Sequence, residues 1–247
     1  MKDDEFGDRM KQYEREYTSA RIPVTDILCV RIDGKNFSKY TKSFTKPFDQ
    51  RMTDLMVNTT YMLVKELRPD IGYTQSDEIT LIFAPSEKQS EYVLSGKVSK
   101  LNSVIASMAS AFFNKQLPTD APPAFFDCRS WGVPNMVEAS NVLLWRAQDA
   151  RKNSVSALFR WTAGHKTMHG LNGQQMATVL ENEYDVRWKD LPNQWKYGTY
   201  IKPVVKDVII DDVPVKRTVV EKVDVGFYGD YDLPIRVKMI RKESDRV

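Results

Sequence analysis

Between residues 27 and 133 the chain alternates short, mostly apolar runs with two long stretches of helical periodicity. The apolar runs predict strands at 27–32, 71–75, 79–83 and 124–133. The stretch from Asp49 to Leu67 repeats apolar side chains every three or four residues, and so does the stretch from Glu87 to Gln116. The order strand, helix, strand, strand, helix, strand predicts an α+β fold with a ferredoxin-like sheet and helices on one face.

After Pro134 the pattern changes. Helical spacing runs from Met136 to about Thr162 and again from Gln174 to Tyr184, with a polar, glycine-containing segment between them. Residues 200–225 are rich in Val, Ile, Lys and Asp around an Asp-Asp pair, which predicts a hairpin with one exposed face. We therefore expect a catalytic core at 1–135 and a helical and hairpin region at 136–247 that packs on it.

Composition excludes few functions. No stretch approaches the roughly 20 apolar residues of a membrane span, and the charged start MKDDEFGDRMKQYERE is unlike a signal peptide, so we expect a cytoplasmic protein without membrane contact. The net charge of +3, from 36 basic and 33 acidic residues, permits nucleic-acid binding without requiring it. Cys29 and Cys128 form no CxxC pair and are expected to be free, buried thiols.

Two aspartates lie at predicted strand ends. Asp33 follows the first strand in an Asp-Gly pair, and Asp77 lies in the polar Ser76-Asp77-Glu78 segment between the second and third strands. If these strands share a sheet, both carboxylates meet at one edge, where two carboxylates and a backbone carbonyl suffice for Mg²⁺. Two such ions activate a hydroxyl and stabilise a leaving oxygen in phosphoryl transfer. The alternative is that both are ordinary turn residues.

Five motifs in order resemble the tRNAHis guanylyltransferase family. They are RIDGKNF at 31–37, KPFD at 46–49, QSDE at 75–78, KVSK at 97–100 and WRAQDARKNS at 145–154. The resemblance spans roughly residues 25–200. It implies a catalytic core similar to a polymerase palm that adds nucleotides to the 5′ end of RNA, opposite to the usual direction.

The resemblance also assigns residues to roles. Asp33 and Asp77 would bind two Mg²⁺ ions together with the carbonyl of Gly34, and Ser76 and Glu78 would flank them in the catalytic site. ATP, GTP or other nucleoside triphosphates would be substrates. The residues expected at the nucleotide are Lys35, Asn36, Phe37, Lys46, Asp49, Lys97 and Lys100. The two lysines of KVSK would bind the triphosphate, although a solvated charged helix face is the alternative.

The WRAQDARKNS motif would contact RNA. Its basic and amide side chains suit phosphate contacts, Trp145 is available for packing or stacking, and an amphipathic helix with internal polar pairs is the alternative. The residues expected to bind RNA are Arg146, Arg151, Lys152 and Asn153. Eukaryotic members carry His-Ile-Asn where this chain has Arg-Lys-Asn at 151–153, so the chain resembles the bacterial and archaeal branch. That branch implies tRNA as partner, a homotetramer, and repair of truncated 5′ ends with the nucleotide selected by the opposite strand.

In the implied reaction ATP, or an existing 5′-triphosphate, activates the RNA end, and the 3′-hydroxyl of the incoming nucleotide then attacks it. Two other hypotheses stay open at this point. A palm-type nucleotide cyclase would use the same carboxylates without RNA, and a non-catalytic RNA-binding module would use only the basic helix. His165 and His169 are four residues apart, but neighbouring glycines and the absence of an acidic partner favour a surface or RNA-facing role over zinc.

Overall fold

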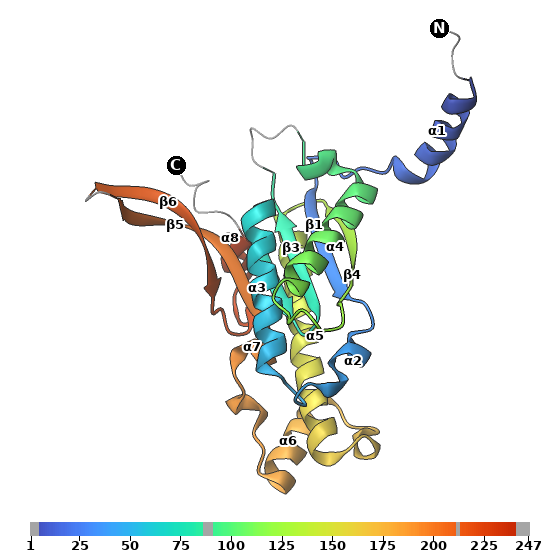
Figure 1. Ribbon diagram of the computed structural model, residues 1–247. Coiled ribbons are helices and arrows are strands. Elements are labelled where there is room, and N and C mark those ends of the chain that lie inside the picture. Colours follow the sequence, from blue (N-terminus) through green and yellow to red (C-terminus); the bar gives the residue numbers. More distant parts are fainter. Residues whose placement is uncertain (1–4, 86–90, 211–212, 241–247) are drawn as a thin grey trace.

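The computed structural model describes residues 5–85, 91–210 and 213–240 (Figure 1). The strands are β1 (Ile27–Gly34), β2 (Ile71–Gln75), β3 (Glu78–Phe83), β4 (Phe126–Val133), β5 (Thr199–Ile210) and β6 (Val213–Val223). The helices are α1 (Glu5–Thr18), α2 (Phe37–Tyr40), α3 (Gln50–Leu67), α4 (Val98–Asn114), α5 (Met136–Ala163), α6 (Gly173–Tyr184), α7 (Asn193–Lys196) and α8 (Leu233–Ile240). Short 3₁₀ turns connect several of them.

The described strands form one antiparallel sheet in the order β4-β1-β3-β2-β5-β6. Its first four strands, with α3 between β1 and β2 and α4 between β3 and β4, have the predicted ferredoxin-like arrangement. The predicted α+β fold is therefore confirmed. The C-terminal hairpin β5–β6 extends the same sheet, because β5 pairs with β2 from Gly72 to Thr74.

Alternation along the strands gives the sheet two apolar faces. On one face Val30, Ile32 and Leu81 pack under α3 and α4, and on the other Cys29 and Ile82 pack under α5. The expectation of helices on one face holds for α3 and α4, while α5 and α8 cover the opposite face. The strands β1 and β3 are thus buried on both sides, which explains why they read as nearly continuous apolar runs.

The helix predicted from Glu87 begins later, at Val98. Residues 86–90 lie outside the described part of the chain. Leu94 and Ser95 adopt left-handed backbone conformations, and Gly96 packs so closely that a Cβ there would lie 2.5 Å from the carbonyl oxygen of Ile22. The apolar spacing that suggested a continuous helix therefore includes side chains of a tight turn before α4.

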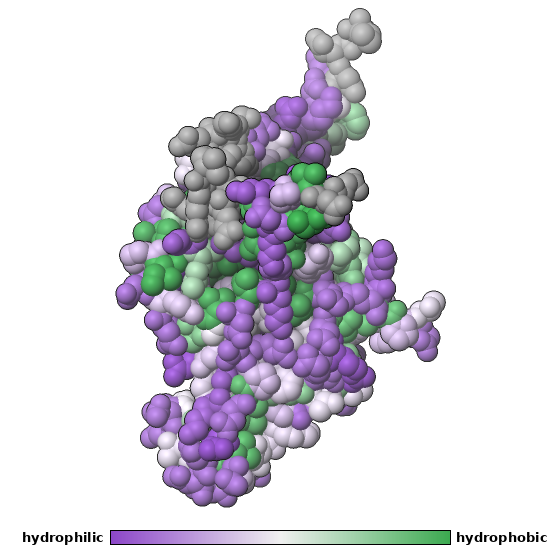
Figure 2. Space-filling model, turned by 90° about the vertical axis from the view of Figure 1, so that its left-hand side faces the viewer, coloured by the Kyte–Doolittle hydropathy of each residue, from purple (hydrophilic) through white to green (hydrophobic). Residues whose placement is uncertain are grey.

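Two elements extend away from this core (Figure 1). Helix α1 has no buried residue, and the distal part of the β5–β6 hairpin is exposed. Figure 2 shows the molecule from the side of the hairpin, where apolar patches interrupt a mainly hydrophilic surface. Among the described helices, none is both long and apolar enough to cross a membrane. The division into 1–135 and 136–247 stays a prediction.

Candidate active site

The pairing of β1 with β3 brings the two aspartates together. Asp33 lies opposite Glu78 in the register, so the end of β1 reaches the β2–β3 turn. That turn contains two residues, Ser76 and Asp77, and Ser76 takes the left-handed conformation (φ 50°) that such tight hairpins require. The backbone N–H of Gly34 donates to the carbonyl of Asp77 at 3.0 Å, which ties the two ends directly together.

The Asp77 carboxylate lies in an unfavourable environment for a negative charge. Burial raises its pKa and the neighbouring charge of Asp33 raises it further, while the Ser76 hydroxyl, 3.1 Å from Oδ1, opposes the shift. In residues 5–85, 91–210 and 213–240, no lysine or arginine lies within ion-pair distance of either aspartate. A divalent cation would relieve exactly this kind of repulsion between neighbouring carboxylates.

The donor set suits magnesium better than a metal that requires an all-protein cage. The described residues contain no group of three or more His, Cys, Asp or Glu side chains that could hold a metal. Asp33 and Asp77 would therefore supply two carboxylates, and water and substrate phosphates would complete the shell, as Mg²⁺ commonly accepts. The residues present fit a magnesium ion that is bound together with its nucleotide.

Glu78 is engaged on the α5 side of the sheet. Its carboxylate accepts from Nε and Nη2 of Arg146 at 2.6 and 2.9 Å, and Arg146 also donates to Asp149 at 2.9 Å. Burial raises the pKa of Glu78, and Arg146 opposes that shift. Both side chains are buried, so the structure corrects the expectation that Arg146 faces RNA: its guanidinium is an internal partner of Glu78.

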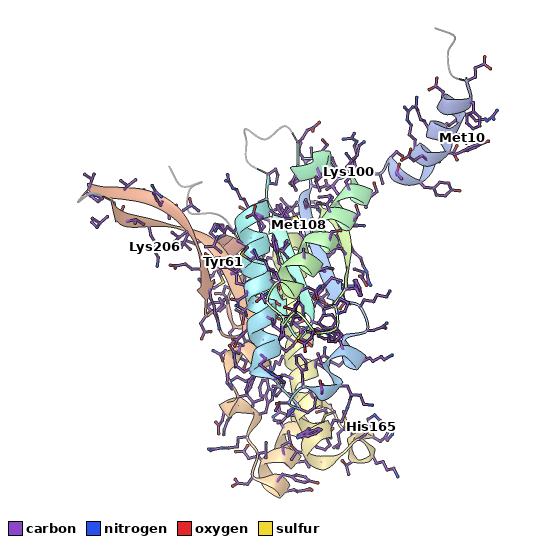
Figure 3. All side chains as sticks on the ribbon, viewed as in Figure 1. Met10, Tyr61, Lys100, Met108, His165 and Lys206 are labelled. Carbon is purple, nitrogen blue, oxygen red and sulfur yellow. The ribbon has the colours of Figure 1, made fainter. Side chains whose placement is uncertain are left out.

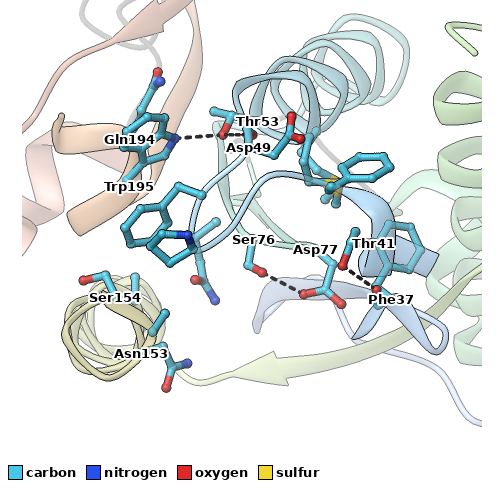
Figure 4. A pocket seen from close by; sticks show the side chains of 18 of the residues that line it. Phe37, Thr41, Asp49, Thr53, Ser76, Asp77, Asn153, Ser154, Gln194 and Trp195 are labelled. Atoms are coloured by element: carbon cyan, nitrogen blue, oxygen red, sulfur yellow. Dashed lines mark hydrogen bonds between the residues drawn. The ribbon is translucent and has the colours of Figure 1, made fainter. Parts of the chain in front are cut away.

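A pocket of about 350 Å³ opens beside Asp77, between α3, α5 and α7 (Figure 4). Phe48 and Trp195 form one wall, with ring centroids 5.3 Å apart and planes 12° from parallel. The indole N–H of Trp195 donates to Thr53 at 3.2 Å, which fixes the orientation of its ring. A flat aromatic wall next to carboxylates suits a nucleotide, whose base stacks while its phosphates approach the metal.

Several polar side chains of the pocket already donate hydrogen bonds within the protein. Three hydroxyls donate to backbone carbonyls: Thr41 to Phe37 at 2.8 Å, Thr53 to Asp49 at 3.2 Å and Thr74 to Glu78 at 2.9 Å. Two side-chain amides donate to side chains: Asn153 to Asp149 at 3.1 Å and Gln194 to Gln50 at 2.8 Å. These hydrogen bonds engage five of the polar side chains that line the pocket, and the aromatic wall of Phe48 and Trp195 supplies a stacking surface beside them.

The residues expected at the nucleotide divide into two groups around α2 and the start of α3. Phe37 is buried against Phe113 and also lines the pocket, whereas Lys35 and Asn36 are exposed at its approach. Lys46 lines the pocket and donates to Thr41 at 3.4 Å. Its ammonium is thereby placed at the pocket rim, where a phosphate would meet it.

Asp49 also lines the pocket, but its carboxylate is already satisfied. It caps α3, accepting from the backbone N–H groups of Arg51 and Thr45 at 2.8 Å and from Nη2 and Nε of the Arg51 guanidinium at 2.8 and 3.2 Å. These hydrogen bonds hold the pKa of Asp49 far below its usual range. The sequence motif KPFD is therefore at least in part a helix cap.

Lys97 and Lys100 lie elsewhere in the chain. Lys97 caps α4 and Lys100 is in its first turn, at the end of the sheet opposite α2 and α7 (Figure 3). Phe113, at the pocket end of α4, is thirteen residues beyond Lys100, or roughly 20 Å along the helix. Within one chain these lysines are therefore not brought together with Asp33, Asp77 and the pocket, and their role in triphosphate binding stays a prediction.

The remaining residues expected to bind RNA lie on the outer side of α5. Arg151, Lys152 and Asn153 are exposed, and Asn153 reaches the pocket. The Arg151 guanidinium lies 5.1 Å from the centre of the Phe227 ring. His165, at the lower end in Figure 3, is exposed together with His169, their rings 6.1 Å apart.

Sequence reasoning missed the aromatic wall. Phe48 lies inside the KPFD motif, in which the sequence prediction rests on the charged residues Lys46 and Asp49. Trp195 lies in a short polar segment without periodicity. Their contact joins positions 147 residues apart, and it depends on β5 returning beside β2. The available signal was the large aromatic of Pro192-Asn193-Gln194-Trp195, directly before a predicted strand.

Comparison with known proteins gives a consistent result. The family model Thg1, tRNAHis guanylyltransferase, matches residues 7–134. The tRNA(His) guanylyltransferase of Schizosaccharomyces pombe is 30% identical over 209 residues, which cover 77% of each chain.

Two solved structures of bacterial tRNA(His) guanylyltransferase-like proteins are similar along most of their length. One, in complex with ATP, shares 37% identity at a TM-score of 0.75 and covers 80% of this chain and 88% of its own. The other, in complex with GTP, shares 31% identity at a TM-score of 0.77, with 96% and 99% covered.

Proposed function

The chain belongs to the tRNAHis guanylyltransferase family, and from this premise we propose that it adds nucleotides in the 3′-to-5′ direction to the 5′ end of tRNA. The family makes it a tRNA guanylyltransferase-like nucleotidyltransferase. The observation that carries the proposal is the meeting of Asp33 and Asp77, through the Gly34–Asp77 hydrogen bond, beside a pocket with an aromatic wall.

Magnesium held by Asp33, Asp77 and the carbonyl of Gly34 would lower the pKa of the attacking hydroxyl and neutralise charge on the phosphates. The protein groups position the reactants. Phe48 and Trp195 hold the base, Lys46 neutralises phosphate at the rim, and Ser76 orients the carboxylate of Asp77. The ATP and GTP complexes of the two bacterial relatives support a site that accepts nucleoside triphosphates.

We further propose that the tRNA, and not the pocket, selects the nucleotide. The aromatic wall supplies a stacking contact with the base, and stacking tolerates every base. Pairing with the opposite strand would then decide which nucleotide is added, and ATP or a 5′-triphosphate would activate the end. The enzyme would thereby repair tRNAs truncated at the 5′ end.

The test is incorporation of labelled nucleotides into 5′-truncated tRNAs that differ only in the base opposite the addition site. We expect guanosine opposite C and the complementary nucleotide opposite each other base, with loss of incorporation when magnesium is chelated. Trp195→Ala should raise the nucleotide concentration needed by about tenfold, because stacking on one ring contributes 1–3 kcal/mol. Trp195→Phe should retain most of that affinity.

Two results would count against the proposal. Addition of guanosine regardless of the opposing base, or activity confined to tRNAHis, would reject selection by the template. Absence of any magnesium-dependent incorporation by the folded protein would reject 3′-to-5′ addition itself.

A further inference from the structure

Trp145 is an exposed aromatic side chain close to, but outside, the nucleotide pocket. It lies on α5, and 48% of it remains exposed although two guanidinium groups contact its ring. The central carbons of Arg146 and Arg31 lie 4.4 and 5.5 Å from the ring centre. The indole is thus contacted by two cations while about half of its surface stays open to solvent.

The two arginines beside it differ in how well they are satisfied. Arg146 makes two hydrogen bonds to Glu78 and one to Asp149. Arg31 lies 3.9 Å from Glu78, and its buried Nε has no hydrogen-bond partner. That buried Nε faces Glu78, so the groups of Arg31 available to a further anion are its terminal nitrogens, which make no hydrogen bond to the described residues.

A third arginine strengthens this conclusion. Arg129 on β4 lies directly opposite Arg31 on β1 in the antiparallel register, so both side chains are on the same face of the sheet. Like charges opposite each other on neighbouring strands are destabilising. Among the described residues Arg129 forms an ion pair with Asp127 alone, at 3.5 Å, and because both side chains are exposed this pair offsets little of that repulsion. A bound phosphate between the two guanidinium groups would remove the conflict.

These residues adjoin the proposed metal carboxylates. Arg31 and Asp33 are two residues apart on β1, so their side chains leave the same face about 6.6 Å from each other. Asp77 lines the pocket of Phe48 and Trp195, whereas Arg31, Arg129 and Trp145 do not. The arginine–tryptophan surface is therefore separate from the nucleotide pocket, and Arg31 adjoins the carboxylates through Asp33.

We propose that Trp145, Arg31 and Arg129 bind the unpaired terminal nucleotide at the 5′ end of the RNA. Its base stacks on the open surface of Trp145, and its phosphate lies between Arg31 and Arg129. The assignment of this nucleotide to RNA rests on the proposed function, which already places the incoming nucleoside triphosphate in the separate pocket of Phe48 and Trp195.

The experiment measures binding by the full chain, without magnesium or free nucleotide, to two 5′-phosphorylated RNA hairpins. One is blunt and the other carries a single unpaired 5′ nucleotide. Trp145→Ala should weaken binding of the hairpin with the unpaired nucleotide on the order of tenfold and leave the blunt one nearly unchanged. Trp145→Phe should retain most of the affinity, since it preserves an aromatic surface.

Matched variants define the specificity of the effect. Trp161 is also on α5 and 63% exposed, but sixteen residues or roughly 24 Å further along the helix, and Trp161→Ala should change neither affinity. Arg129→Ala should weaken both hairpins and reduce the salt dependence of binding, because it removes a phosphate contact.

Three outcomes would overturn the proposal. Equal losses for both hairpins in Trp145→Ala would show that the indole does not contact the unpaired base. A loss of ATP or GTP affinity without a change in RNA affinity would assign the surface to free nucleotide. A change in oligomeric state of Trp145→Ala in sedimentation would show that another protein chain covers it. Because the assay needs no turnover, failure of nucleotide addition leaves its result intact, and the reverse also holds.

Discussion

Two carboxylates line the same pocket, and their surroundings are opposite. Asp49 accepts four hydrogen bonds from Arg51 and Thr45, which lower its pKa, whereas burial and Asp33 raise the pKa of Asp77. The charge on Asp49 is thus compensated within the protein, and the charge on Asp77 is not. The difference separates a carboxylate that holds the fold from one that is available to a ligand.

The largest expected effect comes from removing the uncompensated charge. Asp77→Asn should reduce nucleotide incorporation at saturating magnesium by at least about a thousandfold, since a metal contributes several kcal/mol to such a transition state. The metal-free variant should be as stable as the wild type or more stable, because the repulsion with Asp33 is gone. Incorporation assays and urea unfolding in a chelator measure the two quantities.

Substantial turnover by a folded Asp77→Asn protein would show that Asp77 does not bind the catalytic metal. A marked loss of stability would show that the Asp77 charge is compensated after all, and the contrast with Asp49 would disappear.

A smaller effect is expected at the compensated carboxylate. Asp49→Ala should lower the free energy of unfolding by about 1–2 kcal/mol, the usual cost of losing a helix cap, while turnover stays measurable. Arg51→Ala is the matched control. Its side chain is 68% exposed and the backbone N–H bonds to Asp49 remain, so it should cost less stability than Asp49→Ala.

Urea unfolding of both variants tests this order. If Arg51→Ala cost as much as Asp49→Ala, the ion pair and not the cap would stabilise this end of the pocket. If Asp49→Ala abolished turnover without loss of stability, Asp49 would belong with Asp77 as a ligand-binding group.

The same contrast explains what the sequence could predict. The strands of the core and helix α3 could be predicted, because hydrophobic periodicity is a local pattern of the sequence. The proximity of Asp33 and Asp77 followed once the order of these elements predicted a ferredoxin-like sheet. The prediction that α4 begins at Glu87 was wrong, because Leu94 and Ser95 adopt left-handed conformations in a turn whose side chains have helical spacing.

The sequence could not predict which hydrogen-bond or ion-pair partner each charged side chain has in the fold. The motif at 145–154 contains Arg146, but the motif does not show whether this side chain faces solvent or the sheet. In the structure Arg146 is buried and bonded to Glu78, which lies 68 residues earlier in the chain. The cap of Asp49 was hidden for a related reason, because a carboxylate in a nucleotide-binding motif and a carboxylate that caps a helix read identically. Charge compensation is a property of the assembled site.

The smallest effect is the pH dependence of stability, and it should have two separate windows. Asp77 has a folded pKa above its ordinary value of 3.8, so the folded metal-free protein takes up a proton there more readily than the unfolded chain. The stability that this proton provides is present below pH 3.8 and is lost as pH rises through the raised pKa. Asp49 is the reverse: its contribution is present above pH 3.8 and is lost as pH falls toward its lowered pKa.

As pH falls from 7 to 3 in urea unfolding, the stability difference between wild type and Asp77→Asn should therefore shrink while the pH is still above 3.8, whereas the difference between wild type and Asp49→Ala should begin to shrink only below pH 3.8. Saturating magnesium should remove the first window, because a bound cation keeps Asp77 ionised, and should leave the second unchanged. Convergence of both variants in the same pH range, or an Asp77 window that persists with magnesium, would mean that the metal does not bind at Asp77. The difference between the two carboxylates would then reflect only the burial of Asp77 and the hydrogen bonds to Asp49, and the metal would have to be sought at another position.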